Sequence, residues 1–371
     1  MSTFIPDVNA HLHTPYSFSA FSSVRQALDM ASQEGVQVVG INDFYSMDGY
    51  GEWNTECAER HLYPLFNIEF ISLWQEAQRD GLRINDPNNP GRTYLSGKGL
   101  HFPTPLTGRE AKMLADVRRE SNFQVGSMCQ RLNELLEERH VGIRLSYPRI
   151  VVNLTLGSIR ERHLAKALRM AVEEKYTADD DRMNIYETIC GKPLKSAPAD
   201  VAGIENELRG NLLKAGGAAF VPEDPKAFLP IGDVKRIIEA AGGMPTYPFL
   251  ADDAKGLFTD FEGDLQQCAD TLKKMDIHSV EFISNRNTTA VLEQYAAYLE
   301  DEGFVVTFGS EHNTPAMEPV RLHTRDNAEE LSNTLRSINF RGACRIAAHQ
   351  RGSKSMQMGE ELIMERINVP S

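Results

Sequence analysis

The stretch VQVVGIND, residues 36–43, is the one on which the fold prediction rests. Its run from Val36 to Ile41 is mostly β-branched and apolar, which predicts a strand buried on both faces. A second short strand is predicted at residues 8–13. Between the two strands a helix is expected to begin with a capping box at Ser23 and to end at Gly35. This strand, helix and strand order predicts parallel strands joined by crossover helices.

The same alternation extends along most of the chain. Further strands are predicted at 63–70, 93–102, 244–249, 279–284 and 304–308, with helices at 233–241, 263–274 and 288–301 and a mostly helical segment at 326–351. Residues 108–215 instead carry helix-forming residues and few strand signals. We therefore predict an α/β fold in which residues 1–107 and 216–371 form a β/α barrel and residues 108–215 form a helical insertion. An open doubly wound sheet is the alternative.

The composition of the chain bears on its possible partners and on its location. The 371 residues include 39 Lys and Arg against 52 Asp and Glu, which gives a net charge of −13. Such a charge argues against a nucleic-acid or anionic-membrane partner. No apolar run approaches the roughly 20 residues that span a bilayer. The five cysteines form no CxxC pair, and the first residues do not read as a secretory signal, so we expect free thiols and a cytoplasmic location.

The strongest local motif is His11-Leu12-His13. Alternation along a strand places both imidazoles on one face, about 7 Å apart at their Cα atoms. Two neutral imidazoles in that arrangement can bind one metal ion. Two hydrogen-bonded histidines on a half-buried strand would show the same pattern.

Polar residues also follow other apolar runs, namely Asp43, Glu69, His101, Glu311 and His312. Each could cap an element or lie at the edge of the core. In parallel α/β folds, however, functional side chains gather at the carboxyl ends of the strands. The recurrence of His, Asp and Glu at these ends therefore predicts a shared metal site.

The order of these motifs resembles the PHP (polymerase and histidinol phosphatase) superfamily. The resemblance rests on HxH, INDF, NIEF, a strand-ending His, GG…YP, VEFISN and GSEHN. In addition, SIRERHLA (residues 158–165) resembles part of the inserted subdomain of small PHP phosphoesterases. The resemblance to the PHP superfamily implies a distorted seven-stranded β/α barrel that holds two or three metal ions and hydrolyses a phosphate ester.

The resemblance also implies roles for individual residues. His11 and His13 would be ligands of the first metal, Asp43 an acidic ligand and Glu69 a carboxylate that bridges metals. The next ligand would be His101, followed by Glu311 as the late acidic ligand with His312 beside it.

The chain departs from the family pattern at three ligand positions. Phe44 stands where the family usually has a His after the acidic residue of the second motif. Tyr247 replaces the His that usually precedes a proline, and Asn313 stands in the late Asp-x-His motif. These changes remove nitrogen donors from the expected ligand set. We expect the protein to bind one to three divalent ions of Zn, Mn or Fe.

The predicted activity is hydrolysis of a small phosphorylated metabolite by metal-activated water, in which Glu69 and His312 would take part. The anionic substrate needs cations, for which Arg160 and Arg162 in the insertion are candidates, as are Lys98 and Arg286. Tyr247 is a candidate hydrogen-bond donor to the substrate.

Two other functional classes remain open from the sequence. One is a metal-dependent amidohydrolase or sugar isomerase on a similar barrel. The other is a barrel that binds a ligand without turnover, which the three lost histidine positions motivate. The sequence predicts no oligomeric state.

Overall fold

The computed structural model describes residues 4–222, 224–253 and 255–368. Its central sheet is a nearly closed barrel, with strand order β1-β2-β3-β4-β6-β7-β8. The strands are β1 (Asp7–Leu12), β2 (Val36–Phe44), β3 (Tyr63–Leu73), β4 (Arg92–Lys98), β6 (Met244–Phe249), β7 (Ser279–Ile283) and β8 (Val305–Gly309), and the short β5 (Leu229–Pro230) pairs with β3 outside this path.

The barrel closes between its first and last strands. Leu12 forms a parallel bridge with Glu311, and the backbone N–H of His13 donates to the carbonyl of Glu311 at 2.7 Å. These contacts hold the end of β1 against the turn that follows β8, so the sheet curls into a nearly closed barrel. The predicted barrel is therefore confirmed, and the open doubly wound sheet is excluded.

Strand β4 runs against the others. It pairs antiparallel with both β3 and β6, whereas the remaining neighbours in the barrel are parallel. A parallel strand needs a crossover, usually a full helix. The chain between β3 and β4 holds only the five-residue helix α3 (Gln75–Arg79) and turns. As a result, the carboxyl end of β4 lies at the amino ends of its parallel neighbours.

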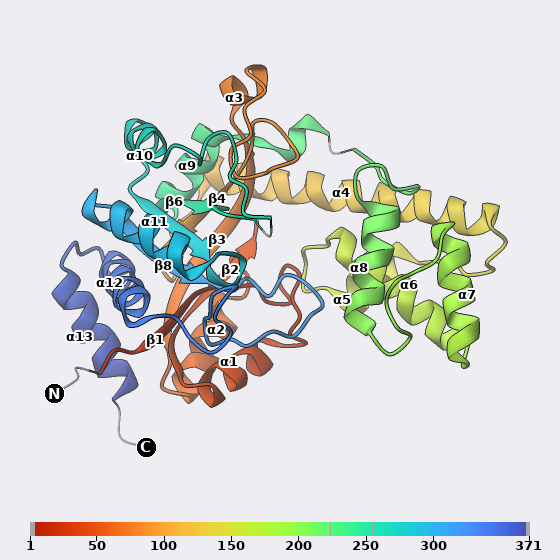
Figure 1. Cartoon of the computed structure of the whole chain (residues 1–371), viewed down its shortest axis with the longest axis horizontal. Helices are drawn as coiled ribbons and strands as arrows, with labels where there is room; N and C mark the ends of the chain where they lie inside the picture. Colours follow the sequence, from red (N-terminus) through yellow and green to blue (C-terminus); the bar gives the residue numbers. More distant parts are fainter. Residues whose placement is uncertain (1–3, 223, 254, 369–371) are drawn as a thin grey trace.

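Helices surround the barrel (Figure 1). They are α1 (Val24–Gln33), α2 (Tyr50–Glu59), α9 (Ile231–Ala240), α10 (Leu265–Lys274), α11 (Thr289–Asp301), α12 (Asn333–His349) and α13 (Met356–Ile367). The expected start of α1 is present, because the Ser23 hydroxyl accepts from the Gln26 N–H at 3.1 Å. The apolar helix faces pack on the outer face of the sheet, where Trp53 of α2 is buried in one cluster with Phe70 of β3 and Phe282 of β7.

The segment from 108 to 213 is helical and has its own apolar cluster. Its helices are α4 (Gly108–Glu138), α5 (Tyr147–Leu154), α6 (Glu161–Lys175), α7 (Asp179–Cys190) and α8 (Val201–Leu208), followed by a π turn, Arg209–Leu213. Helix α4 joins the two parts of the molecule (Figure 1). Leu114 and Val117 at its start belong to the barrel's core, whereas Leu132 and Leu136 belong to the second cluster.

The start of α6 lies against the carboxyl ends of β1 and β2. The His163 ring meets the Phe18 ring edge-on at 4.9 Å between centroids, and the Arg160 guanidinium lies 4.8 Å from the centre of the Phe44 ring. The N–H of Leu156 donates to the carbonyl of Pro15 at 3.3 Å. These contacts place the helical segment beside the mouth of the barrel.

Among the described residues, no helix combines the length and the apolar character that crossing a membrane requires.

Candidate metal centre

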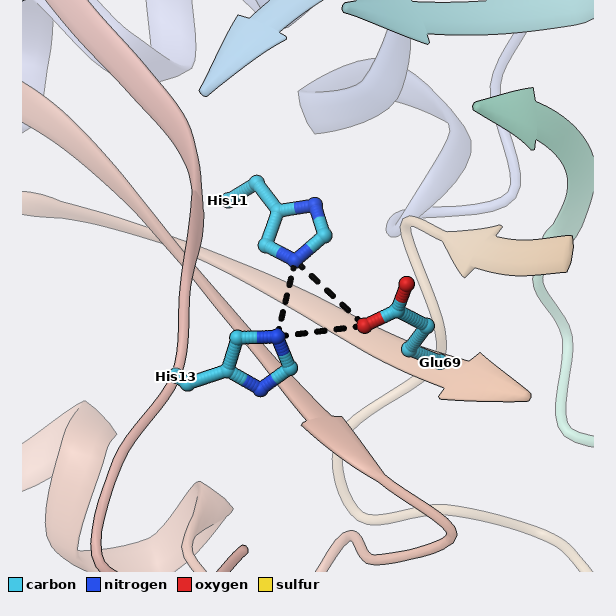
Figure 2. Close-up of side chains that lie close together, drawn as sticks. All are labelled: His11, His13 and Glu69. Carbon is cyan, nitrogen blue, oxygen red and sulfur yellow. Dashed lines mark hydrogen bonds and ion pairs between the residues drawn. The ribbon is translucent and has the colours of Figure 1, made fainter. Parts of the chain in front are cut away.

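Three side chains converge in the barrel interior at the carboxyl ends of β1 and β3. Figure 2 shows His11 and His13 pointing toward Glu69. Their Nε2 atoms lie 3.2 Å apart, and Glu69 Oε2 lies 3.1 Å from His13 Nε2 and 3.6 Å from His11 Nε2. All three residues are buried. Among the described residues, they form a group of His, Cys, Asp or Glu side chains compact enough to bind one ion.

The donor set fits a divalent cation. Glu69 Oε2 is buried, and the ring nitrogens beside it are His13 Nε2 at 3.1 Å and His11 Nε2 at 3.6 Å. These nitrogens are themselves metal donors, so one bound cation would contact all three atoms and offset the cost of burying the carboxylate. Two imidazole nitrogens and one carboxylate oxygen suit Zn, Mn or Fe.

The electrostatics of the cluster favour positive charge at this point. Burial opposes a charge on His11, but Glu281 and Glu69 outweigh it and raise the pKa of His11 to about 9. Burial likewise opposes a charge on Glu69, yet hydrogen-bonding and charge interactions with His11 and His13 lower the pKa of Glu69 to about 2. The carboxylate therefore stays ionised at neutral pH and is available as a metal ligand.

The outer nitrogens of both histidines have partners that orient the rings. His11 Nδ1 lies 3.0 Å from Glu281 Oε2, and His13 Nδ1 lies 3.2 Å from Ser17 Oγ. When each ring is neutral with its proton on Nδ1, the Nε2 lone pair points into the cluster, the usual arrangement around metal-binding histidines. Because the pKa of His11 is raised, this ring would release a proton on binding a metal ion. The Asn42 amide also lies 3.0 Å from the His11 ring nitrogens.

The sequence predicts Asp43 as a metal ligand, but in the structure its carboxylate lies behind His13 and not in the cluster of His11, His13 and Glu69. It accepts from the Thr14 N–H at 2.8 Å, the Thr14 hydroxyl at 2.5 Å and the Ser17 hydroxyl at 2.5 Å, and its Oδ1 lies 3.9 Å from His13 Nδ1. Alternation along β2 directs Asn42 and Phe44 to the interior and Asp43 away from it. Asp43 thus orients His13 through Ser17.

Phe44 closes one side of the cluster. Its ring stacks on His13 with 5.0 Å between centroids and 16° between planes. A hydrocarbon surface therefore covers His13 where the family pattern would supply another nitrogen donor.

The structure does not bring His101 to the cluster. It follows β4, whose antiparallel direction delivers it to the opposite end of the barrel. There its N–H donates to the carbonyl of Ala241 at 3.1 Å, and its ring packs on Gly242. The expectation that it lies with the other strand-end residues assumed a parallel β4.

Glu311 and His312 reach the mouth but are held by other residues. The Glu311 carboxylate pairs with Arg286 and accepts from the Asn313 amide at 2.7 Å. His312 has partners at both nitrogens, the Ser310 hydroxyl at 2.9 Å and the Glu318 carbonyl at 2.8 Å. Both residues have a left-handed backbone, with φ of 63° and 58°, at the turn that ends β8.

Tyr247 faces away from the interior. Its hydroxyl donates to Glu262 Oε1 at 2.8 Å, and its ring packs on Phe249 and Phe261. Its neighbour Pro248 is paired with Glu281, whose side chain reaches His11 in the interior. Period-two alternation therefore gives Tyr247 the helix-facing side of β6, so it cannot donate to a ligand in the barrel.

The four candidate cations have different surroundings. Lys98 is completely buried inside the barrel, with Nζ 2.6 Å from Glu281 Oε2, and Arg286 is paired with Glu311. Arg160 lies on the Phe44 ring, and Arg162 lies 5.7 Å from the centre of the Phe18 ring. Arg160 and Arg162 are thus the two candidates that the insertion places at the mouth.

Glu281 is a site residue that was not predicted. Its signal is present in the sequence, since Glu281 stands among Val280, Phe282 and Ile283 in the same way that Glu69 stands among apolar neighbours. Asn42 and Ser96 on strands and Ser17 in the bend after β1 were not predicted either, because a single uncharged polar residue carries no such signal.

The chain matches no protein-family model and no curated protein. Solved structures that are similar to it in fold include the following two. One is a protein assigned as a metal-dependent phosphoesterase from Bifidobacterium adolescentis, with 16% identity and a TM-score of 0.54 over 90% of this chain and 95% of that one. The other is an amidohydrolase from Chromobacterium violaceum, solved with sulfate and no metal, with 16% identity and a TM-score of 0.53 over 88% and 93%. These similarities bear out the barrel fold.

Proposed function

We propose that the protein is a metal-dependent hydrolase, specifically a phosphoesterase that acts on a small phosphorylated metabolite. The observation that carries the proposal is the convergence of His11 Nε2, His13 Nε2 and Glu69 Oε2 on one buried point. A Zn, Mn or Fe ion bound there would acidify a water molecule and polarise the phosphate ester.

The surrounding residues have separate tasks in this proposal. Glu281 and Ser17 fix the two imidazoles, and Phe44 keeps water from one side of His13. With its pKa lowered to about 2, Glu69 is a weak base, so its task is to hold the ion. His312 holds the turn after β8 through its two hydrogen bonds.

Arg160 and Arg162 would bind the phosphate at the mouth. Burial lowers the pKa of Arg162 to about 10, helped by the neighbouring Arg209, so the side chain stays charged at neutral pH. Two guanidinium groups from one helix start suit the several oxygens of a phosphate group. The two similar structures, a metal-dependent phosphoesterase and an amidohydrolase with bound sulfate, support the same class of ligand.

An amidohydrolase is the second candidate, because one of the two structurally similar proteins carries that name. The same three ligands could activate water against an amide. The two arginines at the mouth favour the phosphate ester, since an uncharged amide does not need them.

The test begins with metal content by elemental analysis. We expect at least one equivalent of metal per wild-type chain, lost in His11→Ala/His13→Ala and retained in His140→Ala/His278→Ala, which alters two exposed histidines. The metal-loaded wild type is then assayed on a panel of phosphate esters and amides. Wild-type protein without metal after loading would overturn the proposal. A loaded protein that cleaves only amides would overturn the phosphoesterase assignment in favour of the second candidate.

A further inference from the structure

A buried ion pair lies directly behind the candidate metal centre. Glu281 and Lys98 are both completely buried, with Lys98 Nζ 2.6 Å from Glu281 Oε2. The same carboxylate accepts from the Ser96 hydroxyl through Oε1 at 2.5 Å and contacts His11 Nδ1 through Oε2 at 3.0 Å. Lys98 also donates to the Ala10 carbonyl at 3.1 Å. Both oxygens of Glu281 are therefore occupied by groups of the chain itself.

The other acids and imidazoles near the mouth are occupied as well. Asp43 accepts three hydrogen bonds from Thr14 and Ser17, and Glu311 is held by Arg286 and Asn313. His312 uses both ring nitrogens. Among the described residues that the sequence nominated, only His11, His13 and Glu69 direct donor atoms to a common point.

The charges in the barrel interior also indicate that one divalent ion binds there. Glu69 and Glu281 supply two negative charges, and Lys98 supplies one positive charge. One divalent ion leaves a single excess positive charge, which Asp43 behind His13 balances. A second divalent ion would add two positive charges, and the acid that the structure places at the mouth, Glu311, is already paired with Arg286. Like charges repel strongly where water is excluded.

We propose that the barrel binds a single divalent ion and that the Lys98 ammonium is the fixed charge that takes the place of a second ion beside Glu281. The inference rests on the proposed metal-dependent function and adds the number of ions and the residue that limits it. Lys98, which the sequence suggested as a substrate contact, thereby acts on the metal centre through Glu281 as a positioning residue.

The experiment is a metal count on chelator-stripped full-length chain reloaded with Mn²⁺ or Zn²⁺. Elemental analysis and calorimetric titration are expected to give one equivalent in wild type with a single-site isotherm. Two or more equivalents in wild type would overturn the inference while supporting a metal-dependent enzyme. One equivalent without any hydrolysis would support the inference and count against the proposed function.

Three variants test the part played by Lys98. Lys98→Met removes the ammonium, and we expect its count to rise from one equivalent to two because Glu281 becomes available. Lys98→Met/Glu281→Gln removes both charges together and is expected to return the count to one. Lys112→Met, which breaks an exposed ion pair with Asp116, is the matched control and should remain at one.

Circular dichroism establishes that each variant is folded. A folded Lys98→Met chain that still takes up one equivalent would overturn the role assigned to Lys98. If Lys98→Met does not fold, the charge-matched double variant and the wild-type count still decide the number of ions, since two equivalents in either would contradict the proposal.

Discussion

The barrel interior and the core of the helical insertion are both buried, but they are built from opposite kinds of side chain. The insertion core is a cluster of aliphatic residues such as Leu132, Leu164 and Leu168. The barrel interior instead holds hydrogen-bonded and charged groups, with Lys98 and Glu281 at its centre. Apolar burial stabilises a fold without regard to direction, whereas a buried polar network requires specific partners. The contrast separates the part of the molecule that supports the fold from the part that supports chemistry.

Truncation in the insertion core should produce the largest loss of stability among the following tests. Leu168 is completely buried, so Leu168→Ala is expected to lower the free energy of unfolding by about 2–5 kcal/mol through lost transfer and a cavity. Chemical denaturation gives this value, and metal content should be unchanged. A loss of metal by a variant that remains folded would show that the two regions are coupled more tightly than their separate cores imply.

A buried acid outside the barrel interior gives a second test. Glu262 accepts from Tyr247 and from the N–H groups of Leu250 and Ala251, but burial dominates and raises its pKa from 4.5 to about 7. The folded state therefore binds a proton that the unfolded state has lost between about pH 4.5 and 7. The resulting stabilisation is present below pH 4.5 and is lost as the pH rises through 7.

The expected size of this change is up to about 3 kcal/mol, because each pKa unit corresponds to about 1.4 kcal/mol. Unfolding by urea at pH 5 and pH 8 measures the change in wild type, and Glu262→Gln should flatten this part of the pH profile. An unchanged profile in Glu262→Gln would assign the pH dependence to other groups. Asp260→Asn, at an exposed ion pair with Arg83, is a suitable control.

The smallest effect is expected from the link between His13 and Asp43. Ser17→Ala removes the hydroxyl that accepts from His13 Nδ1 and donates to Asp43. Partners of this kind are typically worth about 10–100-fold in metal affinity, so we expect a weakening of about tenfold, with the fold retained. Titration calorimetry with Mn²⁺ measures the affinity, and Ser22→Ala on the exposed turn before α1 serves as the control. An unchanged affinity in Ser17→Ala would remove Asp43 from the supporting structure of the site.

Local patterns in the sequence were sufficient for much of the fold and for the centre of the candidate site. Apolar runs and helix caps predicted the order of strands and helices because those signals act over a few residues. His11 and His13 could be paired in advance because strand alternation fixes their common face. Glu69 could be nominated because a carboxylate between apolar neighbours on a strand needs a partner.

Only the tertiary structure decided which of the remaining candidates meet. The reversal of β4 sends His101 to the far end of the barrel, and the face of β6 turns Tyr247 outward. The pairing of Lys98 with Glu281 joins strands that the helical insertion separates in the sequence. Strand direction, register and the matching of buried charges all depend on contacts between distant segments, so a pattern within one segment does not determine them.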